Sequence, residues 1–326
     1  MAATLRRLAL ALATVLLVLT VTFAGVHLAP GDPVALYLGP NADAASAGVM
    51  RHDRGLDRPL PVQYAQWLGR FVSGDWGTSI AQHRAVTRVL GDALWPTLIL
   101  SSVSLLLSYL IGIAIGAWQA VQRRTTWDWS LTALTIFVQA IPAYVLALGL
   151  VLVFAYGAAL WHWPAPLRLP AMGAASIGAD LLSPPQRLGD ALRHLILPVI
   201  TLSAIGAAGL ARYVRASTIE ALRQPAVRTA RAKGLAEMRV LSRHALRNAL
   251  VPVITLAGLQ LPALFSGVVF VEVIFAWPGM GRVMVTAVLG RDYPVIMAAT
   301  AVFAGLVVIG NLIADACVAM ADPRVR

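Results

Sequence analysis

Basic residues are concentrated in one polar stretch, Arg212–Arg247, which lies between two long apolar runs. It holds nine Arg or Lys residues and two Glu residues, a net charge of +7 out of +11 for the whole chain. Short basic loops between membrane spans are typical of the cytoplasmic side, because Lys and Arg resist translocation. Within the stretch, Ala230, Ala232 and Gly234 give a helical face almost no side-chain bulk. This combination is suited to non-covalent docking against a cytoplasmic protein.

Residues that could perform covalent or metal chemistry do not cluster. The only lysine, Lys233, follows Ala232, whereas a phosphate-binding loop needs a Gly-Lys-Ser/Thr run, so another chain must bind any ATP that is used. The only cysteine, Cys317, excludes an intramolecular disulfide. No nucleophile lies beside a base, and the histidines show no pair at ligand spacing. We therefore expect no catalytic residue, no metal site and no cofactor bound by this chain.

The composition is that of a membrane protein, with 59% hydrophobic residues, 13% charged residues and a mean hydropathy of +0.75. A membrane-spanning helix needs about 20 apolar residues, and backbone groups in lipid must bond within their own segment. The first candidate is longer than the apolar part of a signal peptide, so an uncleaved helix is favoured. The sequence predicts an all-α polytopic protein with six transmembrane helices, at about 8–28, 97–120, 131–156, 194–211, 249–271 and 295–320.

The distribution of charge predicts the topology. Arg6 and Arg7, Arg123 and Arg124, the 212–247 loop and the C-terminal arginines share one side if both termini are cytoplasmic. The high pI of about 10.9 follows from these loops, so no nucleic-acid partner is expected. The predicted division is a first helix at 1–28, a small external subdomain at 29–96 with a short surface helix near 62–72, a core at 97–322 and a tail at 323–326.

The predicted spans contain few ionisable residues but several small residues and prolines. Ion-coupled carriers usually hold buried carboxylates or histidines along their pathway, so this scarcity argues against that class. Gly112 and Gly116 form a small-xxx-small pair, which allows close helix packing in lipid. Prolines within or beside spans predict kinks or breaks, at Pro142, Pro198, Pro252 and Pro262. Together these features predict bent helices around a pathway.

Several runs resemble one family in order and spacing. They are APGDPVALYLG after the first helix, GLDRPLPVQYAQWLGRFVSGDWGTS in the external segment, and then HALRNALVPVIT, VEVIFAWPGMGRVMVTAVLGRDYPV and the final DPRVR. The chain resembles the permease subunits of ATP-binding-cassette (ABC) importers for peptides and nickel, in particular the first of the two permeases. The resemblance covers nearly the whole chain.

The resemblance implies a type I ABC importer permease fold in the bacterial inner membrane. It also implies a second homologous permease, two ABC ATPase subunits that bind ATP and Mg, an extracytoplasmic substrate-binding protein and surrounding lipids. In this family a helix of the cytoplasmic loop docks on the ATPase. The matching run RTARAKG starts with Arg228, where the general motif has Glu. The expected coupling residues are Arg228, Thr229, Ala230, Arg231, Ala232, Lys233, Gly234, Glu237 and Arg239.

The substrate and the substrate-binding residues remain open at this stage. Di- or oligopeptides are favoured over nickel because no His or Met cluster is present, and other small solutes are also transported within the family. Two further classes are alternatives: an ion-coupled secondary transporter, and a structural or assembly protein without a pathway. A membrane enzyme is disfavoured because no catalytic arrangement is visible.

Overall fold

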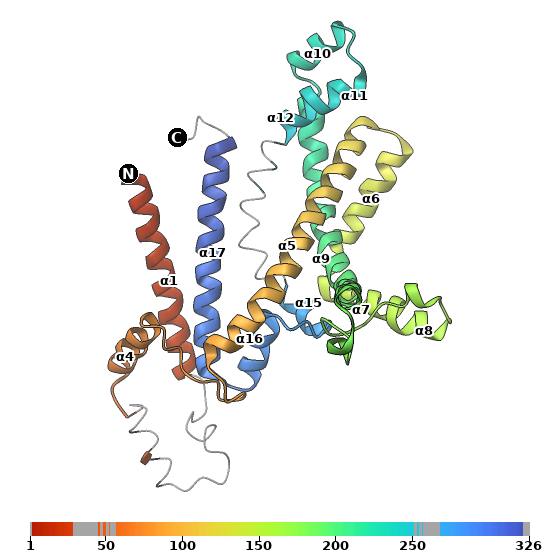
Figure 1. Cartoon of the computed structure of the whole chain (residues 1–326). Coiled ribbons are helices and arrows are strands. Elements are labelled where there is room, and N and C mark those ends of the chain that lie inside the picture. Colours follow the sequence, from red (N-terminus) through yellow and green to blue (C-terminus); the bar gives the residue numbers. More distant parts are fainter. Residues whose placement is uncertain are drawn as a thin grey trace. The chain divides into compact units, whose positions relative to one another are not determined.

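The computed structural model describes residues 2–28, 57–250 and 268–321, together with positions 45, 48, 49, 52, 253 and 256. Within these residues the chain is helical, and its only extended pairing is an isolated bridge between Thr78 and Ala85 (Figure 1). The long helices are α1 (Ala2–Leu28), α5 (Val86–Val121), α9 (Pro184–Ala221) and α17 (Tyr293–Ala321). The shorter ones are α4 (Leu60–Val72), α6 (Thr126–Ala140), α7 (Ala143–Val151), the π-helix η1 (Leu152–Gly157), α8 (Ala158–Leu160), η2 (Ala165–Leu167), η3 (Ala179–Leu181), α10 (Pro225–Ala232), α11 (Glu237–Arg239), the π-helix η4 (Val240–Leu246), α12 (Arg247–Ala249), α15 (Val269–Ile274) and α16 (Met280–Leu289).

Five helical segments in the described part of the chain are long and apolar enough to cross a bilayer. They confirm the all-α polytopic fold class, and they are Ala9–Leu28, Val86–Val121, Ala143–Leu160, Pro184–Ala221 and Tyr293–Ala314. The predicted fifth span, 249–271, lies largely outside the described residues. Its two ends are described as α12 and α15.

The prediction of one continuous helix over 131–156 is wrong. α6 ends at Ala140 and α7 begins at Ala143, and the two residues between them are extended, with ψ of 124° at Ile141 and 140° at Pro142. A proline disfavours the helical conformation of the residue before it, so Ile141 cannot continue α6. The apolar segment that can span the membrane is therefore Ala143–Leu160, and α6 is a separate helix of 15 residues.

The predicted fourth span, 194–211, is much longer in the structure. α9 extends over 38 residues, because its apolar centre continues into polar turns at both ends. At its start the Ser183 backbone N–H donates to Gln186 Oε1 at 3.2 Å, which satisfies one donor at the helix N-terminus. Pro198 lies inside α9 and Pro96 inside α5, and both helices continue through them.

The chain divides into two compact units, of which the first comprises residues 1–95 and 279–308. Its core joins the start of α5 to α16 and α17 through Val86, Leu90, Met280 and Ala299. The buried carboxylate of Asp292 holds the loop that precedes α5. Its Oδ2 accepts hydrogen bonds from Ser79 Oγ at 2.5 Å and from the Ala81 backbone N–H at 3.1 Å.

In this unit the Gly-Asp-Trp-Gly run at residues 74–77 forms a turn after α4. Gly74 and Gly77 have backbone φ angles of 88° and 79°, which residues other than glycine rarely adopt. Between them, the Trp76 ring stacks on Phe71 with centroids 5.1 Å apart.

The second unit comprises residues 96–278 and 309–326, and its centre is the contact between α5 and α9. A Cβ added at Gly112 would lie 2.9 Å from Leu210 Cβ, and one at Gly116 would lie 2.4 Å from the Ala211 carbonyl oxygen. The glycines therefore allow the two helices to approach this closely, which confirms the predicted small-xxx-small packing.

Polar contacts fix the other helices of this unit to the α5–α9 pair. The Asp128 carboxylate at the start of α6 accepts from Arg215 Nε at 2.8 Å and from its terminal nitrogen at 2.7 Å. Near α15, Thr97 Oγ1 donates to Glu272 Oε1 at 2.6 Å, and Glu272 is fully buried. Both carboxylates are hydrogen-bonded, as burial requires.

Candidate coupling site

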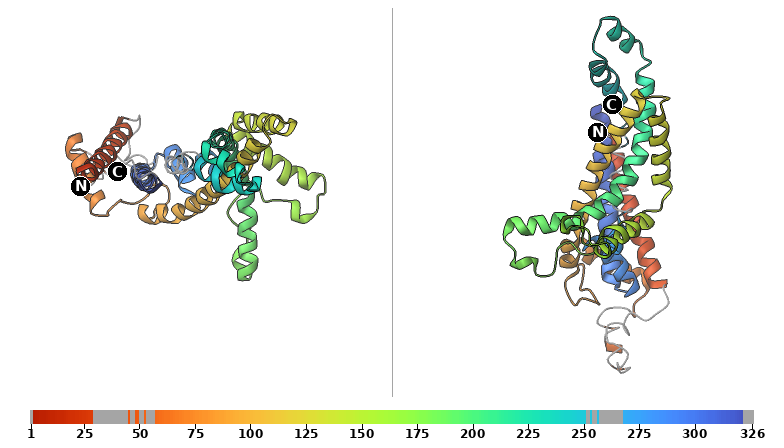
Figure 2. Two further views of the ribbon diagram at one scale, coloured as in Figure 1. Left: turned by 90° about the horizontal axis from the view of Figure 1, so that it is seen from above. Right: turned by 90° about the vertical axis from the view of Figure 1, so that its right-hand side faces the viewer.

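The polar stretch singled out in the sequence comprises the last turns of α9, up to Ala221, and a small helical cap that follows them. In Figure 1, α10 and α11 lie beyond the ends of α5 and α6, and α12 lies level with the upper end of α5; the right-hand view of Figure 2 shows the same cap at the top. α10 begins with Pro225 directly after Gln224, and a proline is favourable at the first helical position because its missing N–H would have no intrahelical partner there. The Val227 N–H then donates to the Gln224 carbonyl at 3.1 Å.

A core of small side chains fixes α10 to the helices that follow it. Its buried members come from α9, α10, η4 and α12, and they are Ala221, Val227, Ala230, Val240, Ala245 and Ala249. Leu222, Leu235 and Leu241 pack against this core and are partly buried. Because most of these side chains are alanine or valine, the helices lie close together and α10 is held on one side only.

The end of α10 is a Schellman motif. The Gly234 N–H donates to the Arg231 carbonyl at 2.9 Å, and the Leu235 N–H reaches back to the Ala230 carbonyl at 3.4 Å. Gly234 has φ of +71°, the left-handed conformation that such a helix end requires. Leu235 then packs on the small core. The sequence signal for this motif was the run Lys233, Gly234 and Leu235 directly after the helical segment.

An ion pair closes the loop after α10. Two guanidinium nitrogens of Arg231 donate to Glu237, with Nε 3.1 Å from Oε2 and one terminal nitrogen bonded to Oε1. This hydrogen bonding lowers the pKa of the Glu237 carboxyl below its ordinary value of 4.5. The pair connects the last turn of α10 to the first turn of α11.

The predicted coupling residues fall into three groups. Arg228, Thr229, Ala232 and Lys233 are exposed and lie on the side of α10 opposite its core; we call these four residues the docking face. Arg231 and Glu237 form the ion pair just described, and Gly234 and Arg239 are also exposed.

Ala230 lies on the opposite side of α10 from the docking face. It is only 4% exposed and belongs to the small core. Ala230 and Gly234 therefore do not form a shared exposed surface, in contrast to the expectation from their four-residue spacing, because Ala230 is buried in the small core while Gly234 is exposed beyond the end of α10. The small residue on the exposed side is Ala232.

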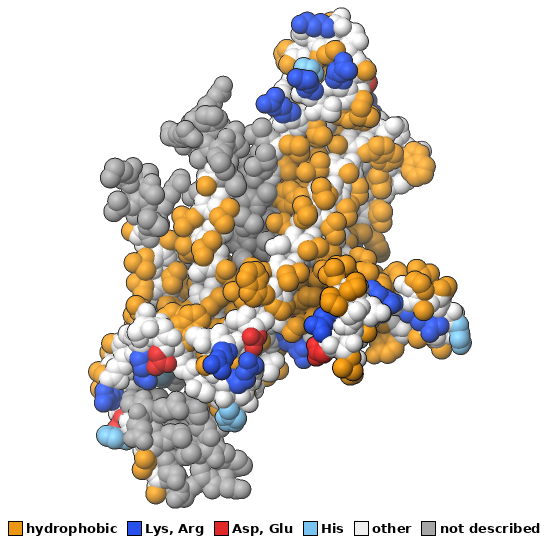
Figure 3. Space-filling view, viewed as in Figure 1, with side chains coloured by type: hydrophobic (Ala, Val, Ile, Leu, Met, Phe, Trp, Pro, Cys, Tyr) orange, Lys and Arg blue, Asp and Glu red, His pale blue; other side chains and the backbone are white. Residues whose placement is uncertain are grey.

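One exposed apolar residue was missed. Met238 is 74% exposed beside the ion pair, and its signal in the sequence was a large apolar side chain between Glu237 and Arg239 in an otherwise polar stretch. Basic side chains surround this region, and Figure 3 shows them over the α10–α12 cap, above the apolar surfaces of α5 and α6. The cap thus presents a positively charged surface that includes the exposed Met238 and the small side chain of Ala232.

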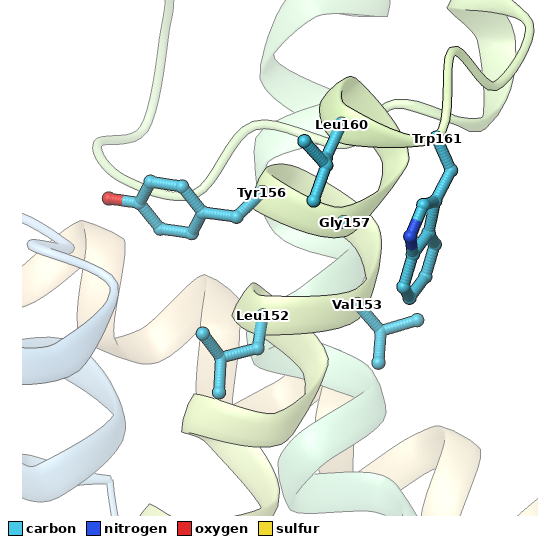
Figure 4. A pocket seen from close by; sticks show the side chains of 6 residues that line it. All are labelled: Leu152, Val153, Tyr156, Gly157, Leu160 and Trp161. Carbon is cyan, nitrogen blue, oxygen red and sulfur yellow. The ribbon is translucent and has the colours of Figure 1, made fainter.

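A second feature of the same unit is an apolar hollow of about 620 Å³ beside η1 (Figure 4). Its lining comes from a single helical segment and contains no charged residue: Leu152, Val153, Tyr156, Gly157, Leu160 and Trp161. Within the described residues, no group of three or more His, Cys, Asp or Glu side chains is arranged to hold a metal ion. The hollow is lined almost entirely by apolar groups, and the α10–α12 cap is the stronger candidate site.

The long apolar helices and the positively charged cap define the class: a polytopic membrane protein with a polar, basic segment after α9. The chain belongs to the family of binding-protein-dependent transport system inner membrane components, whose model matches residues 112–326. A second model, for the N-terminal part of such membrane components, matches residues 1–101. The chain is a multi-pass inner membrane protein and a permease subunit of an ABC importer.

Relatives match over almost the full length. The oligopeptide transport system permease protein AppB of Bacillus subtilis is 40% identical over 99% of this chain and 98% of the relative. A Brucella suis biovar 1 protein named as a peptide permease is 39% identical, and the glutathione transport system permease protein GsiC of Salmonella choleraesuis is 38% identical, each with the same coverage. The family works with a substrate-binding protein, an ATPase and a partner permease.

Proposed function

We propose that this chain is one of two different permease subunits in an ATP-driven importer of di- or oligopeptides. The observation that carries this proposal is full-length similarity to permeases that are named for oligopeptides, peptides and glutathione, itself a tripeptide. The chain forms half of the substrate pathway. A substrate-binding protein delivers the peptide from outside, and two ATPase subunits bind ATP and Mg and hydrolyse the nucleotide on the cytoplasmic side.

The proposed topology places both termini and the α10–α12 cap in the cytoplasm. Residues 29–96 then form an external segment, residues 97–322 form the permease core, and 323–326 form a cytoplasmic tail. The charge of the 212–247 stretch supports this orientation, because a net charge of +7 is retained on the cytoplasmic side.

The docking face of α10 is the proposed contact with one ATPase subunit. Three observations support it: the face is exposed, Ala232 leaves room at its centre, and the small core, the Schellman motif and the ion pair make α10 rigid. When the ATPases close on ATP, a rigid element can pass their movement to α9, from which α10 follows directly. Such rigid-body transmission through packed elements is common in transporters.

Co-purification and transport test the proposal together. Ala232→Trp places a large side chain at the centre of the docking face, and Ser242→Trp, also at an exposed position of the cap, is the matched control. The chain is co-expressed with its ATPases, second permease and binding protein and is reconstituted in vesicles. Ala232→Trp is expected to lose ATPase subunits and peptide uptake, whereas Ser242→Trp keeps both.

Two results would contradict separate parts of the proposal. If Ala232→Trp retained the ATPase and transported at the normal rate, α10 would not be the contact. If the complex assembled normally but no di- or oligopeptide stimulated its ATP hydrolysis through the binding protein, the substrate class would be wrong while the permease role remained.

A further inference from the structure

The helix α4 lies beside a membrane-spanning helix although it is too short to cross the bilayer itself. The apolar part of α1, Ala9–Leu28, has 20 residues, which match the hydrocarbon thickness at about 30 Å. α4 has 13 residues and none of them is buried in the protein. Among the described residues, none packs closely enough on α4 to bury any of its side chains.

Contacts between the two helices show how deep α4 reaches. The Tyr64 hydroxyl lies 2.8 Å from Thr20 Oγ1, and the Phe23 ring contacts both Tyr64 and Trp67, with centroids 5.2 and 5.9 Å apart. Thr20 precedes Leu28 by eight residues, which is about 12 Å along a helix. The tip of Tyr64 thus lies well inside the leaflet that holds the Leu28 end of α1.

The polar pair fits this location. A hydroxyl group in hydrocarbon is costly unless it has a hydrogen-bond partner. Tyr64 and Thr20 supply each other with one, and Thr20 also donates to the Leu16 carbonyl at 2.7 Å within its own helix. In water neither group would need the other.

The sequence of α4 divides its circumference into three arcs. The contact arc faces α1 and the turn after α4, with Tyr64, Trp67 and Phe71. A polar arc carries Gln63, Gln66 and Arg70. The remaining arc is entirely apolar at the spacing of one helical stripe, with Pro61, Ala65, Leu68 and Val72.

No described part of the chain buries this last arc, which we call the free stripe. Val72 is 79% exposed, Pro61 and Ala65 are exposed, and Leu68 is half-buried. The apolar surface of α1 is exposed as well, with Val21 62% exposed. An amphipathic helix with such a stripe binds a bilayer by burying its apolar side beneath the headgroups.

We propose that α4 is embedded in the membrane interface, with its free stripe in the acyl region and its polar arc toward the headgroups and water. The segment that follows α1 is thereby fixed to the bilayer surface at two points, α1 and α4. The occupant of the stripe is the lipid of the leaflet that contains the Leu28 end of α1.

Spin-label accessibility tests this placement on the full chain in lipid nanodiscs, in which both faces are open to reagents. Cys317→Ser removes the only native cysteine, and single cysteines are then introduced by Ala65→Cys and Val72→Cys on the free stripe. Gln66→Cys on the polar arc of the same helix is the matched control. All three sites are partly or fully exposed, so we expect α4 to tolerate the label. The yield of each variant and its elution volume in size-exclusion chromatography check that it is folded.

Oxygen concentrates in the acyl region, whereas a water-soluble nickel chelate is excluded from it. Labels at 65 and 72 are expected to collide more with oxygen than with the chelate, and the label at 66 to show the reverse. Equal access to the chelate at all three sites would overturn the proposal by placing α4 in water. Protection of 65 and 72 from both reagents would also overturn it, because protein would then cover the stripe.

Discussion

Gly234 combines an exposed position with a backbone conformation that few residues adopt. Its φ of +71° lies in the left-handed region, and nothing lies within 4 Å of a Cβ added there. Loss of function on substitution therefore has two possible physical causes: strain in the Schellman motif, or added bulk where the ATPase docks. Alanine and asparagine separate them, because asparagine is larger but tolerates the left-handed conformation better.

Gly234→Ala is expected to weaken coupling more than Gly234→Asn. In the left-handed region a Cβ costs about 1–2 kcal/mol, enough to loosen the end of α10. The measurement is peptide uptake per ATP hydrolysed in reconstituted vesicles, with hydrogen exchange over residues 225–240 as a direct reading of the motif. If asparagine proved more damaging than alanine, steric access rather than backbone strain would govern this position.

Glu237→Gln is expected to have a small effect on stability. Both members of the ion pair are about half exposed, at 46% for Arg231 and 58% for Glu237, and exposed pairs contribute less than about 1 kcal/mol. Because Arg231 lowers the folded-state pKa of Glu237, the contribution is fully present above the ordinary value of 4.5. It is lost as the pH falls through the lowered pKa.

Hydrogen exchange of the loop after α10 checks this expectation. Protection in the native chain should be constant from pH 8 to pH 6 once intrinsic exchange rates are corrected, and Glu237→Gln should lower it slightly throughout that range. A pronounced loss of protection in the native chain near pH 6 would show that another group controls the loop.

At the scale of helices, the α5–α9 contact depends on the absence of two side chains. A Cβ at Gly116 would lie 2.4 Å from a backbone oxygen that cannot move without distorting α9, whereas the nearest atom to a Cβ at Gly112 is Leu210 Cβ at 2.9 Å. Gly149 in α7 provides a control, because a Cβ there meets nothing within 4 Å.

The expected order of thermal stability in detergent is Gly149→Ala above Gly112→Ala above Gly116→Ala. Overpacking a close contact typically costs about 1–3 kcal/mol, and Gly116→Ala should lie at the upper end because its clash is with backbone. The midpoint of unfolding, followed by circular dichroism, provides the measurement. Equal midpoints for Gly116→Ala and Gly149→Ala would contradict the tight contact described here.

The sequence predicted where the helices are better than where they begin and end. Long apolar runs identify spans because lipid admits few backbone alternatives. The break at Ile141–Pro142 has a local cause that the sequence displays, yet whether a proline breaks or only bends a helix depends on packing, as the continuous path through Pro96 and Pro198 shows. The polar ends of α9 carry no hydropathy signal, so its true length was not predictable.

The sequence located the segment that forms the candidate site, but it did not show which residues of that segment are exposed. Charge and small residues located α10, whereas the division of its residues between core and docking face required knowledge of the helix that packs against it. Ala230 is an example. An alanine is small enough for either the core or the exposed side of α10, and Ala230 is buried because it packs in one core with Val240 and Ala245.

At the scale of the whole molecule, the proposed function requires one orientation in the membrane. The α10–α12 cap must face the ATPases in the cytoplasm, and the loop between α8 and α9 must then face the outside. Ser242 in the cap and Ile177 in that loop are both exposed, the latter at 107% of its reference area, so each can report the side on which it lies.

Single cysteines at these two positions, in the Cys317→Ser background, test the orientation in intact cells with a membrane-impermeant maleimide. Ile177→Cys is expected to label from outside, and Ser242→Cys only after the membrane is opened by detergent. The physical reason is the net charge of the 212–247 stretch, which opposes its passage across the bilayer. Labelling of Ser242→Cys in intact cells would place the cap outside, where no ATP is available, and the docking face could then not be a coupling site at all.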